Sequence, residues 1–276
     1  MGLYQRRQSG FMPHKAARIS LRLFIFTGGF SMIDVNFDFT SDTPKYWDNY
    51  WGKDPLFGGP TYDPDNASST MRLYQKLLYS KLLPNGETMD LKIGSGSNYL
   101  TWKDFRFGSD SILASFRYVN YRNMIERVAE RLPNYQEFME NFLHKAYTIG
   151  GEIIFPKRTW GINPSRGCNY QIKDRWDLTL ECIRRYYLGE DSPLYSCLIK
   201  DKAFFDLFVD FKGYVDFFYL QDCVTEDYSR VKFWIGNGEF EHFPLPKTAD
   251  EYLTWIENEL DFVAKRNARI AKAINS

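Results

Sequence analysis

Residues 172–188, IKDRWDLTLECIRRYYL, give the strongest helix signal in the chain and decide the fold class. On a wheel of 100° per residue, apolar side chains three or four positions apart fall on one stripe. The stripe consists of Ile172, Trp176, Leu180, Ile183 and Tyr187. This pattern predicts a helix that packs one face into the core.

The segments on either side of this helix predict more helix than strand. Further helices are expected from Ser68 or Ser69 to a turn at 84–86, and over 118–132, 134–147 and parts of 201–222. A long last helix is expected from Thr248, because Thr248 and Glu251 have capping-box spacing. Short strands are expected at 35–39, 89–93, 99–102 and 153–155. The sequence therefore predicts an α+β fold, a helix-dominated single globular domain with a small sheet and a long C-terminal helix.

Composition narrows the class of protein. Of 276 residues, 44% are hydrophobic and 18% aromatic, enough to fill a large core without metals or disulfides. Lys plus Arg equals Asp plus Glu, at 35 each, which argues against a protein that mainly coats nucleic acid or an anionic membrane. This balance does not exclude a basic cleft on one part of the surface. The four cysteines include no C-x-x-C pair, so we expect reduced thiols in a cytoplasmic protein and no metal site.

The first thirty-one residues differ in composition from the rest of the chain. They contain no Asp or Glu, whereas ordinary composition begins at Met32. We expect residues 1–31 to be an upstream extension outside the fold, and residues 32–276 to form the domain. A targeting segment or a structured arm are the alternatives. The apolar run at 21–30 is far shorter than the ~20 residues that a membrane span requires, so no membrane partner is expected.

Polar residues on and before the 172–188 helix form the candidate site. Opposite the apolar stripe lie Asp174, Asp177, Glu181, Arg184 and Arg185, and the preceding loop carries Asn163, Arg166 and Asn169. One interpretation is a solvated face with ordinary i,i+4 ion pairs. The other is a polar cleft, in which three carboxylates do acid–base chemistry and the loop grips a phosphate or carboxylate. In that interpretation Asp174, Asp177 and Glu181 are catalytic, and Asn163, Arg166, Asn169 and Arg185 bind the ligand.

A second candidate is the aromatic run at 204–222, FFDLFVDFKGYVDFFYLQD. It predicts a buried helical hairpin bent at Gly213. The alternative is an exposed platform on which a base or a sugar stacks.

Several strings resemble a bacterial family of domains of unknown function. They are TIGGEIIFP (148–156), GINPSRG (161–167), KDRWDLTLECIRRYYLGEDSPL (173–194), FFDLFVDFKGYVDFFYLQDCVTEDYS (204–229), FDFTSDTP (37–44) and STMRLYQKLLYSKLLPNG (69–86). The resemblance extends over about residues 34–275, and it implies one domain. It transfers no activity and no catalytic residue.

Two functions remain open from the sequence. The first is an enzyme that acts on a nucleotide or nucleic acid, of the toxin or phage-defence type, with a phosphate-bearing partner. The second is a non-catalytic binding or protein-interaction module, since the chain lacks HExxH, GxSxG, Walker and GxGxxG motifs. The sequence does not identify a cofactor or an oligomeric state.

Overall fold

The computed structural model describes residues 33–94, 98–112, 122–157, 162, 172, 175–236, 240 and 246–275. The chain divides between Met32 and Ile33, and the fold described below belongs to the second unit. Ten α-helices lie within these ranges. They are α1 (Tyr50–Lys53), α2 (Pro64–Ala67), α3 (Ser69–Tyr79), α4 (Arg122–Arg131), α5 (Tyr135–Ala146), α6 (Trp176–Leu188), α7 (Tyr195–Leu198), α8 (Lys202–Phe205), α9 (Phe211–Phe217) and α10 (Ala249–Ile274).

Four antiparallel strands form one sheet in the order β1-β2-β3-β4. They are β1 (Lys92–Ile93), β2 (Leu100–Trp102), β3 (Phe105–Ser111) and β4 (Glu152–Pro156). The predictions at 99–102 and 153–155 are confirmed, and the one at 89–93 shrinks to two residues. Strand β3, FRFGSDS, was not predicted, because Gly, Ser and Asp interrupt its apolar alternation.

The expected strand at 35–39 is wrong. Asp38 accepts hydrogen bonds from the backbone N and the hydroxyl of Thr40, and caps a 3₁₀ turn at Phe39–Ser41. The apolar alternation is still used, because Val35 and Phe37 pack against the core. These two side chains therefore fill the core although the segment forms no strand.

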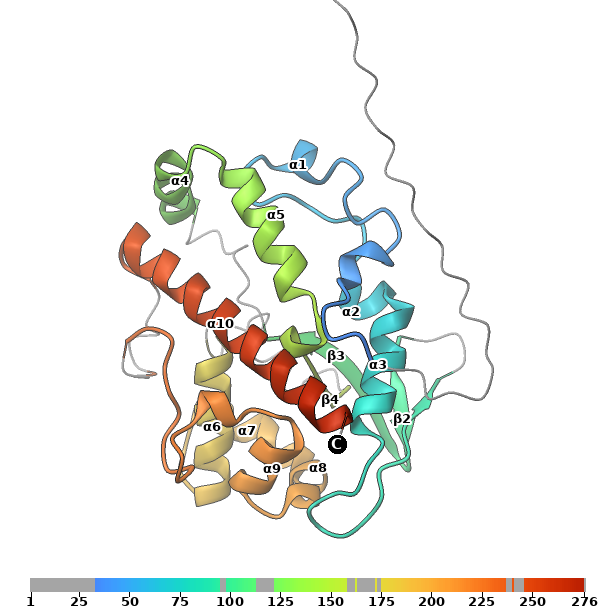
Figure 1. Ribbon diagram of the computed structural model, residues 1–276. Helices are drawn as coiled ribbons and strands as arrows, with labels where there is room; N and C mark the ends of the chain where they lie inside the picture. Colours follow the sequence, from blue (N-terminus) through green and yellow to red (C-terminus); the bar gives the residue numbers. More distant parts are fainter. Residues whose placement is uncertain are drawn as a thin grey trace, which may run out of the picture. The chain divides into compact units, whose positions relative to one another are not determined.

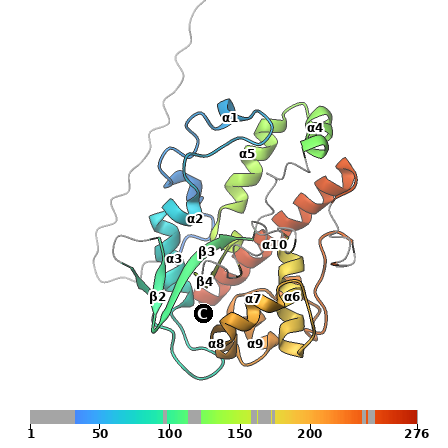
Figure 2. The same ribbon diagram turned by 180° about the vertical axis from the view of Figure 1, so that it is seen from behind.

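Helix α10 runs diagonally past most other elements (Figure 1). Its N-terminal half lies beside α4 and α5, and its C-terminal end lies near the sheet and α3, a placement that the reverse view repeats (Figure 2). The predicted cap is confirmed, since Glu251 N donates to Thr248 Oγ1 at 3.1 Å. The side chain of Glu251 in turn accepts from Lys247 N at 2.6 Å.

Arg266 joins α10 to the rest of the fold. The side chain is completely buried, and it donates to the carbonyls of Phe218, Gly150 and Glu152 and to the Tyr79 hydroxyl, at 2.8–3.0 Å. One guanidinium thus satisfies four acceptors from three segments of the chain.

The aromatic run at 204–222 is core and not a stacking platform. Its rings at positions 204, 205, 208, 211, 214, 217 and 218 are all buried. The predicted bend at Gly213 is wrong, because the helices break at Val209 and Asp210, between the 3₁₀ turn Asp206–Phe208 and α9. Gly213 lies inside α9, where a Cβ would stand 2.1 Å from the carbonyl oxygen of Phe208. Glycine is used there for close approach of two backbones.

Candidate functional site

The sequence-predicted site is only partly within the described residues. Asn163, Arg166, Asn169 and Asp174 lie outside them. Asp177, Glu181 and Arg185 lie on α6 as expected. The apolar stripe of this helix is confirmed, because Trp176, Leu180 and Ile183 are fully buried and Tyr187 is partly buried.

Asp177 forms a buried ion pair at the start of α6. Arg175 donates through Nε to Asp177 Oδ1 at 3.0 Å and through Nη2 to Asp177 Oδ2, and both side chains have no solvent exposure. Trp234 N also donates to Asp177 Oδ2 at 2.8 Å, while Arg175 Nη2 donates to Ile235 O at 2.9 Å. This carboxylate therefore connects α6 to the segment at 234–235.

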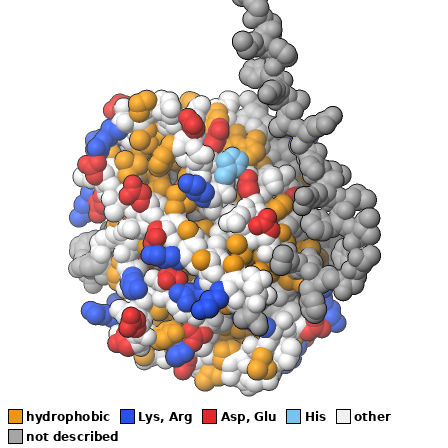
Figure 3. Space-filling model, in the orientation of Figure 1, with side chains coloured by type: hydrophobic (Ala, Val, Ile, Leu, Met, Phe, Trp, Pro, Cys, Tyr) orange, Lys and Arg blue, Asp and Glu red, His pale blue; other side chains and the backbone are white. Residues whose placement is uncertain are grey.

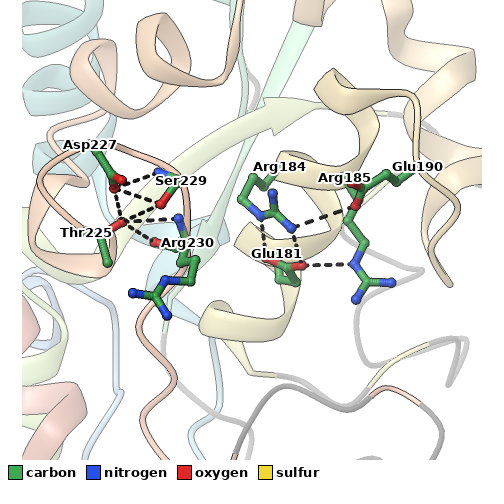
Figure 4. A network of polar contacts seen from close by, with 8 residues as sticks. All are labelled: Glu181, Arg184, Arg185, Glu190, Thr225, Asp227, Ser229 and Arg230. Carbon is green, nitrogen blue, oxygen red and sulfur yellow. Dashed lines mark hydrogen bonds and ion pairs between the residues drawn. The ribbon is translucent and has the colours of Figure 1, made fainter.

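Glu181 holds two arginines (Figure 4). Arg184 grips both carboxylate oxygens, through Nε at 2.8 Å and Nη2 at 2.9 Å, and Arg185 Nε donates to Oε1 at 2.9 Å. The Arg185 guanidinium also lies over the Phe240 ring, 4.7 Å from its centroid. Glu181 thus accepts three charge-assisted hydrogen bonds.

The solvated-face interpretation of α6 is wrong for Asp177 and Glu181. Their residues are 0% and 5% exposed, and Leu178 between them is also buried. Both carboxylates are paired with arginine, so they stabilise the fold in the geometry described. A catalytic role for Asp177 and Glu181, and a ligand-binding role for Arg185, stay predictions.

A cluster that the sequence did not indicate lies between α2, α3 and the sheet. We call it the Arg72 cluster, and its members are Asp65, Arg72, Gln75, Ser109 and Glu152. Arg72 Nη1 donates to Gln75 Oε1 at 2.8 Å and also contacts Ser109 Oγ, which donates to the same Gln75 oxygen at 2.6 Å. Arg72 and Gln75 are 4% and 0% exposed. The cluster is therefore built mainly from buried side chains.

Local structure explains how the cluster is assembled. Ser68 caps α3 through Met71 N at 3.0 Å, and Arg72 and Gln75 follow one turn apart on that helix. On the sheet, Ser111 pairs with Glu152 in the β3–β4 register. Because Ser109 is two residues before Ser111, its side chain lies on the same face of the sheet as that of Glu152.

One edge of the Arg72 guanidinium has no partner among the described residues. Nε and Nη2, the two atoms of this edge, are both inaccessible to solvent and form no hydrogen bond there. They are the two parallel donors that grip a carboxylate or a phosphate. The side-chain nitrogen of Gln75, Nε2, is likewise buried and unpartnered. The Arg72 cluster thus contains three buried donor atoms that have no partner among the described residues.

The other two fully buried arginines of the described chain use the same edge. Arg175 places it on Asp177, and Arg266 places it on Phe218 O and the Tyr79 hydroxyl. Arg72 differs although it is also buried. A buried guanidinium with an unpaired edge is costly, so its retention indicates a partner that the described side chains do not supply.

Two carboxyls accompany Arg72 without pairing with it. Burial raises the pKa of Glu152 well above its usual range, and the neighbouring Asp65 carboxyl raises it further. Burial, followed by the charge of Asp63, raises the pKa of Asp65 to about 8. At neutral pH both groups therefore mostly hold protons. No ion pair within 4.0 Å joins either group to Arg72 in the described chain.

Burial also lowers the pKa of Arg72, an effect opposed by the charges of Asp65, Glu152 and Asp63. The neighbouring carboxyls thus act on the guanidinium through space. The cluster as a whole holds one buried cation, two carboxyls with raised pKa values and one amide, an arrangement suited to an oxyanion and to proton transfer.

A weak signal for this cluster was present in the sequence. Glu152 is the single charged residue in the apolar string IGGEIIFP, and it stands at a strand position that faces the core. Arg72 stands among Met71, Tyr74 and Leu78, which form the apolar stripe of α3. A charged residue inside an apolar pattern is informative, but sequence alone did not bring these two residues together.

The fold and the cluster define a helix-dominated α+β domain with a buried cation and two carboxyls at its helix–sheet junction. The chain belongs to the Family of unknown function (DUF6994), which it matches over residues 33–270. No curated protein and no solved structure matches the chain.

The described ranges contain no group of three or more His, Cys, Asp or Glu side chains arranged to hold a metal ion. No helix in them combines the length and the apolar character needed to cross a membrane.

Proposed function

We propose that the protein is an enzyme that binds a phosphate-bearing substrate at Arg72 and transfers protons through Asp65 and Glu152. The single observation that carries this proposal is the Nε/Nη2 edge of buried Arg72, which no described residue uses. Two parallel N–H donors match two oxygens of a phosphate group, and low solvent exposure strengthens the interaction. A bound anion would also neutralise the buried charge.

The carboxyl pair supports catalysis in addition to binding. A carboxyl with a pKa of about 8, as at Asp65, exchanges protons readily near neutral pH. In the proposed hydrolysis, water attacks phosphorus and the bond to the leaving oxygen breaks. One carboxyl donates its proton to that oxygen while the ionised partner accepts a proton from water. The reactive form of the pair holds one proton before and after the step. Because both carboxyls are mostly protonated at neutral pH, this form becomes more abundant, and activity should rise, as the pH approaches 8.

A nucleotide, or the end of a nucleic acid, is the substrate class we favour. Positive and negative side chains are interspersed over the described part of the face in Figure 3, without an extended basic area. This charge pattern and the equal numbers of acidic and basic residues suit a small ligand better than a long duplex. A toxin or phage-defence role remains our hypothesis for the biology of the protein.

We also propose a bacterial cytoplasmic location. Cys182, Cys197 and Cys223 are buried free thiols, as a reducing compartment allows, whereas Cys168 lies outside the described residues. The bacterial assignment rests on the resemblance of the sequence strings. Fractionation of the native host followed by immunodetection tests the location, and recovery in the extracellular or membrane fraction would contradict it.

The experiment that tests the function compares binding and turnover in matched variants. Inorganic phosphate and a panel of nucleotides are titrated into the full chain, and phosphate release from each nucleotide is measured. We expect Arg72→Met to abolish binding. Arg269→Ala, which changes a partly exposed arginine of α10 that pairs with Asp222 outside the cluster, should keep it. Glu152→Gln should keep binding and lose turnover.

A non-catalytic binding module is the second candidate. It is favoured by the three unpartnered donors of Arg72 and Gln75, which need only a bound anion to be satisfied. Binding that depends on Arg72, without turnover of any nucleotide in the panel, would establish this candidate and reject the enzyme.

A further inference from the structure

Resting on the proposed function, we infer that the Arg72 cluster selects oxyanions that carry a proton of their own, such as phosphate and phosphate monoesters, over sulfate-type anions, which carry none. The inference concerns which anion the site prefers, whereas the proposed function concerns whether it binds one.

The donors of the cluster do not discriminate between these anions. Arg72 Nε, Arg72 Nη2 and Gln75 Nε2 can each donate to any oxyanion oxygen. Sulfate and phosphate both present four oxygens in tetrahedral geometry. If donors alone surrounded the anion, the two would bind with similar affinity.

The carboxyl oxygens supply the discrimination. Glu152 Oε1, Glu152 Oε2 and Asp65 Oδ1 are all buried and receive no hydrogen bond from any other group in the described chain, although the Asp65 and Glu152 carboxyls lie within hydrogen-bonding reach of each other. A protonated carboxyl has one O–H donor and retains a carbonyl oxygen that can only accept. Two carboxyls with at most one proton each therefore always leave acceptor lone pairs in the cluster.

An acceptor beside a bound anion favours an anion that brings a donor. The hydroxyl of a singly protonated phosphate can donate to a carboxyl oxygen, and phosphate monoesters are partly in this form because their second pKa is about 6. Sulfate has no proton in this pH range. Its oxygens can accept from the carboxyl O–H groups, but they can donate nothing to the carbonyl oxygens of the two carboxyls, so these buried acceptors stay unsatisfied.

The charges around the cluster also favour an anion that carries a proton. Asp63, on the cap of α2, and Asp110, on β3, both raise the pKa of Glu152, so they place negative potential on the cluster. Arg266 opposes them, but its donors are already used by three carbonyls and a hydroxyl. The tyrosines Tyr79 and Tyr147 have raised pKa values and stay neutral. Arg72 is thus the buried cation of the cluster that still has donors for a ligand. A single such cation beside these acids suits a monoanion better than a dianion.

Calorimetric titration of the full chain with inorganic phosphate and with sulfate, at pH 6.5 and constant ionic strength, tests the inference. We expect phosphate to bind at least about tenfold more tightly, the ratio supplied by one hydrogen bond to a charged group. Asp65→Asn and Glu152→Gln replace acceptor oxygens with amide donors, and each should narrow that ratio by strengthening sulfate binding. Arg269→Ala, outside the cluster, should leave the ratio unchanged.

The outcomes separate the inference from the proposed function. Equal affinity for the two anions, lost in Arg72→Met, would overturn the inference and leave the anion site in place. No binding of either anion, or binding that survives Arg72→Met, would overturn the proposed function and the inference with it. The wild-type ratio needs no variant, so a variant that fails to fold does not remove the test.

Discussion

Arg175 and Asp177 form a two-bonded ion pair in which neither side chain has any solvent exposure. The pair stands at the first turn of α6, where Trp234 N donates to Asp177 Oδ2 and Arg175 Nη2 donates to Ile235 O. Through these contacts the pair connects α6 to the 234–235 segment.

Removing one member of that pair should be strongly destabilising. Asp177→Ala leaves the Arg175 charge buried and unpaired, and we expect a loss of about 3–5 kcal/mol in the free energy of unfolding. Urea unfolding followed by circular dichroism measures the loss. Asp261→Ala is the control, because it removes an exposed i,i+4 pair with Lys265 and should cost less than about 0.5 kcal/mol. A loss below 1 kcal/mol for Asp177→Ala would contradict the structural assignment.

Arg72 should respond differently from Arg175 although both are buried. Arg72→Met removes an incompletely paired cation, so we expect the free energy of unfolding to change by less than about 1 kcal/mol or to increase. Arg175→Met leaves Asp177 without its partner and should lose about 3–5 kcal/mol. Side-by-side urea unfolding of the two variants measures the difference. Equal, large losses would show that Arg72 is bound to the scaffold and is not reserved for a ligand.

The helices could be predicted from the sequence because their signals are local. The apolar stripe of α6, the Ser68 cap of α3 and the Thr248 cap of α10 each lie within one or two helical turns. Strand β3 could not be predicted in this way. Its residues Gly108, Ser109 and Asp110 are strand residues only because β4 pairs with them from more than forty positions along the chain.

The candidate site shows the same limit. Of the predicted polar face, Asp177, Glu181, Arg184 and Arg185 lie on α6, and Asp174 lies outside the described residues. The burial of Asp177 involves the 234–235 segment, which the helical wheel does not contain. The Arg72 cluster combines α2, α3, β3 and β4, so no single window of sequence includes it. The cluster is recognised by its buried donors and acceptors that lack partners, and these are apparent only in the tertiary structure.

Deleting residues 1–31 should leave the fold intact. The motive is the change in composition at Met32, where the second unit and the family match also begin, at Ile33. We expect the melting temperature of the shortened chain to stay within about 3 °C of the full chain, which is on the order of 1 kcal/mol for a domain of this size. Differential scanning calorimetry of both chains measures it. A fall of more than about 5 °C would show that the segment stabilises the domain.

The pH dependence of stability should identify Asp65 as a buried acid. Its pKa is raised to about 8 in the folded protein, by burial first and by the charge of Asp63 second, from a usual value near 3.8. Below pH 4 the group is protonated in both states and costs nothing. Between about pH 4 and pH 8 the unfolded chain gains by ionising while the folded chain does not, so stability falls by at most about 1.4 kcal/mol per pH unit.

Asp65→Asn removes this pH-dependent loss of stability. The free energy of unfolding of the variant, relative to the wild type, should therefore increase as pH rises from 5 to 8, and the difference should stay constant above pH 8. Urea unfolding at pH 5, 6.5, 8 and 9 measures the difference. Asp227→Asn is the matched control, because hydrogen bonds from Thr225 and Ser229 lower the pKa of Asp227 to about 2. Its stabilising effect is lost only as pH falls towards 2, so the Asp227→Asn offset should not change between pH 5 and pH 9. If Asp65→Asn gives an equally flat offset, the pKa of Asp65 is not raised in the folded protein, and the raised carboxyl pKa on which the proposed proton transfer rests is absent.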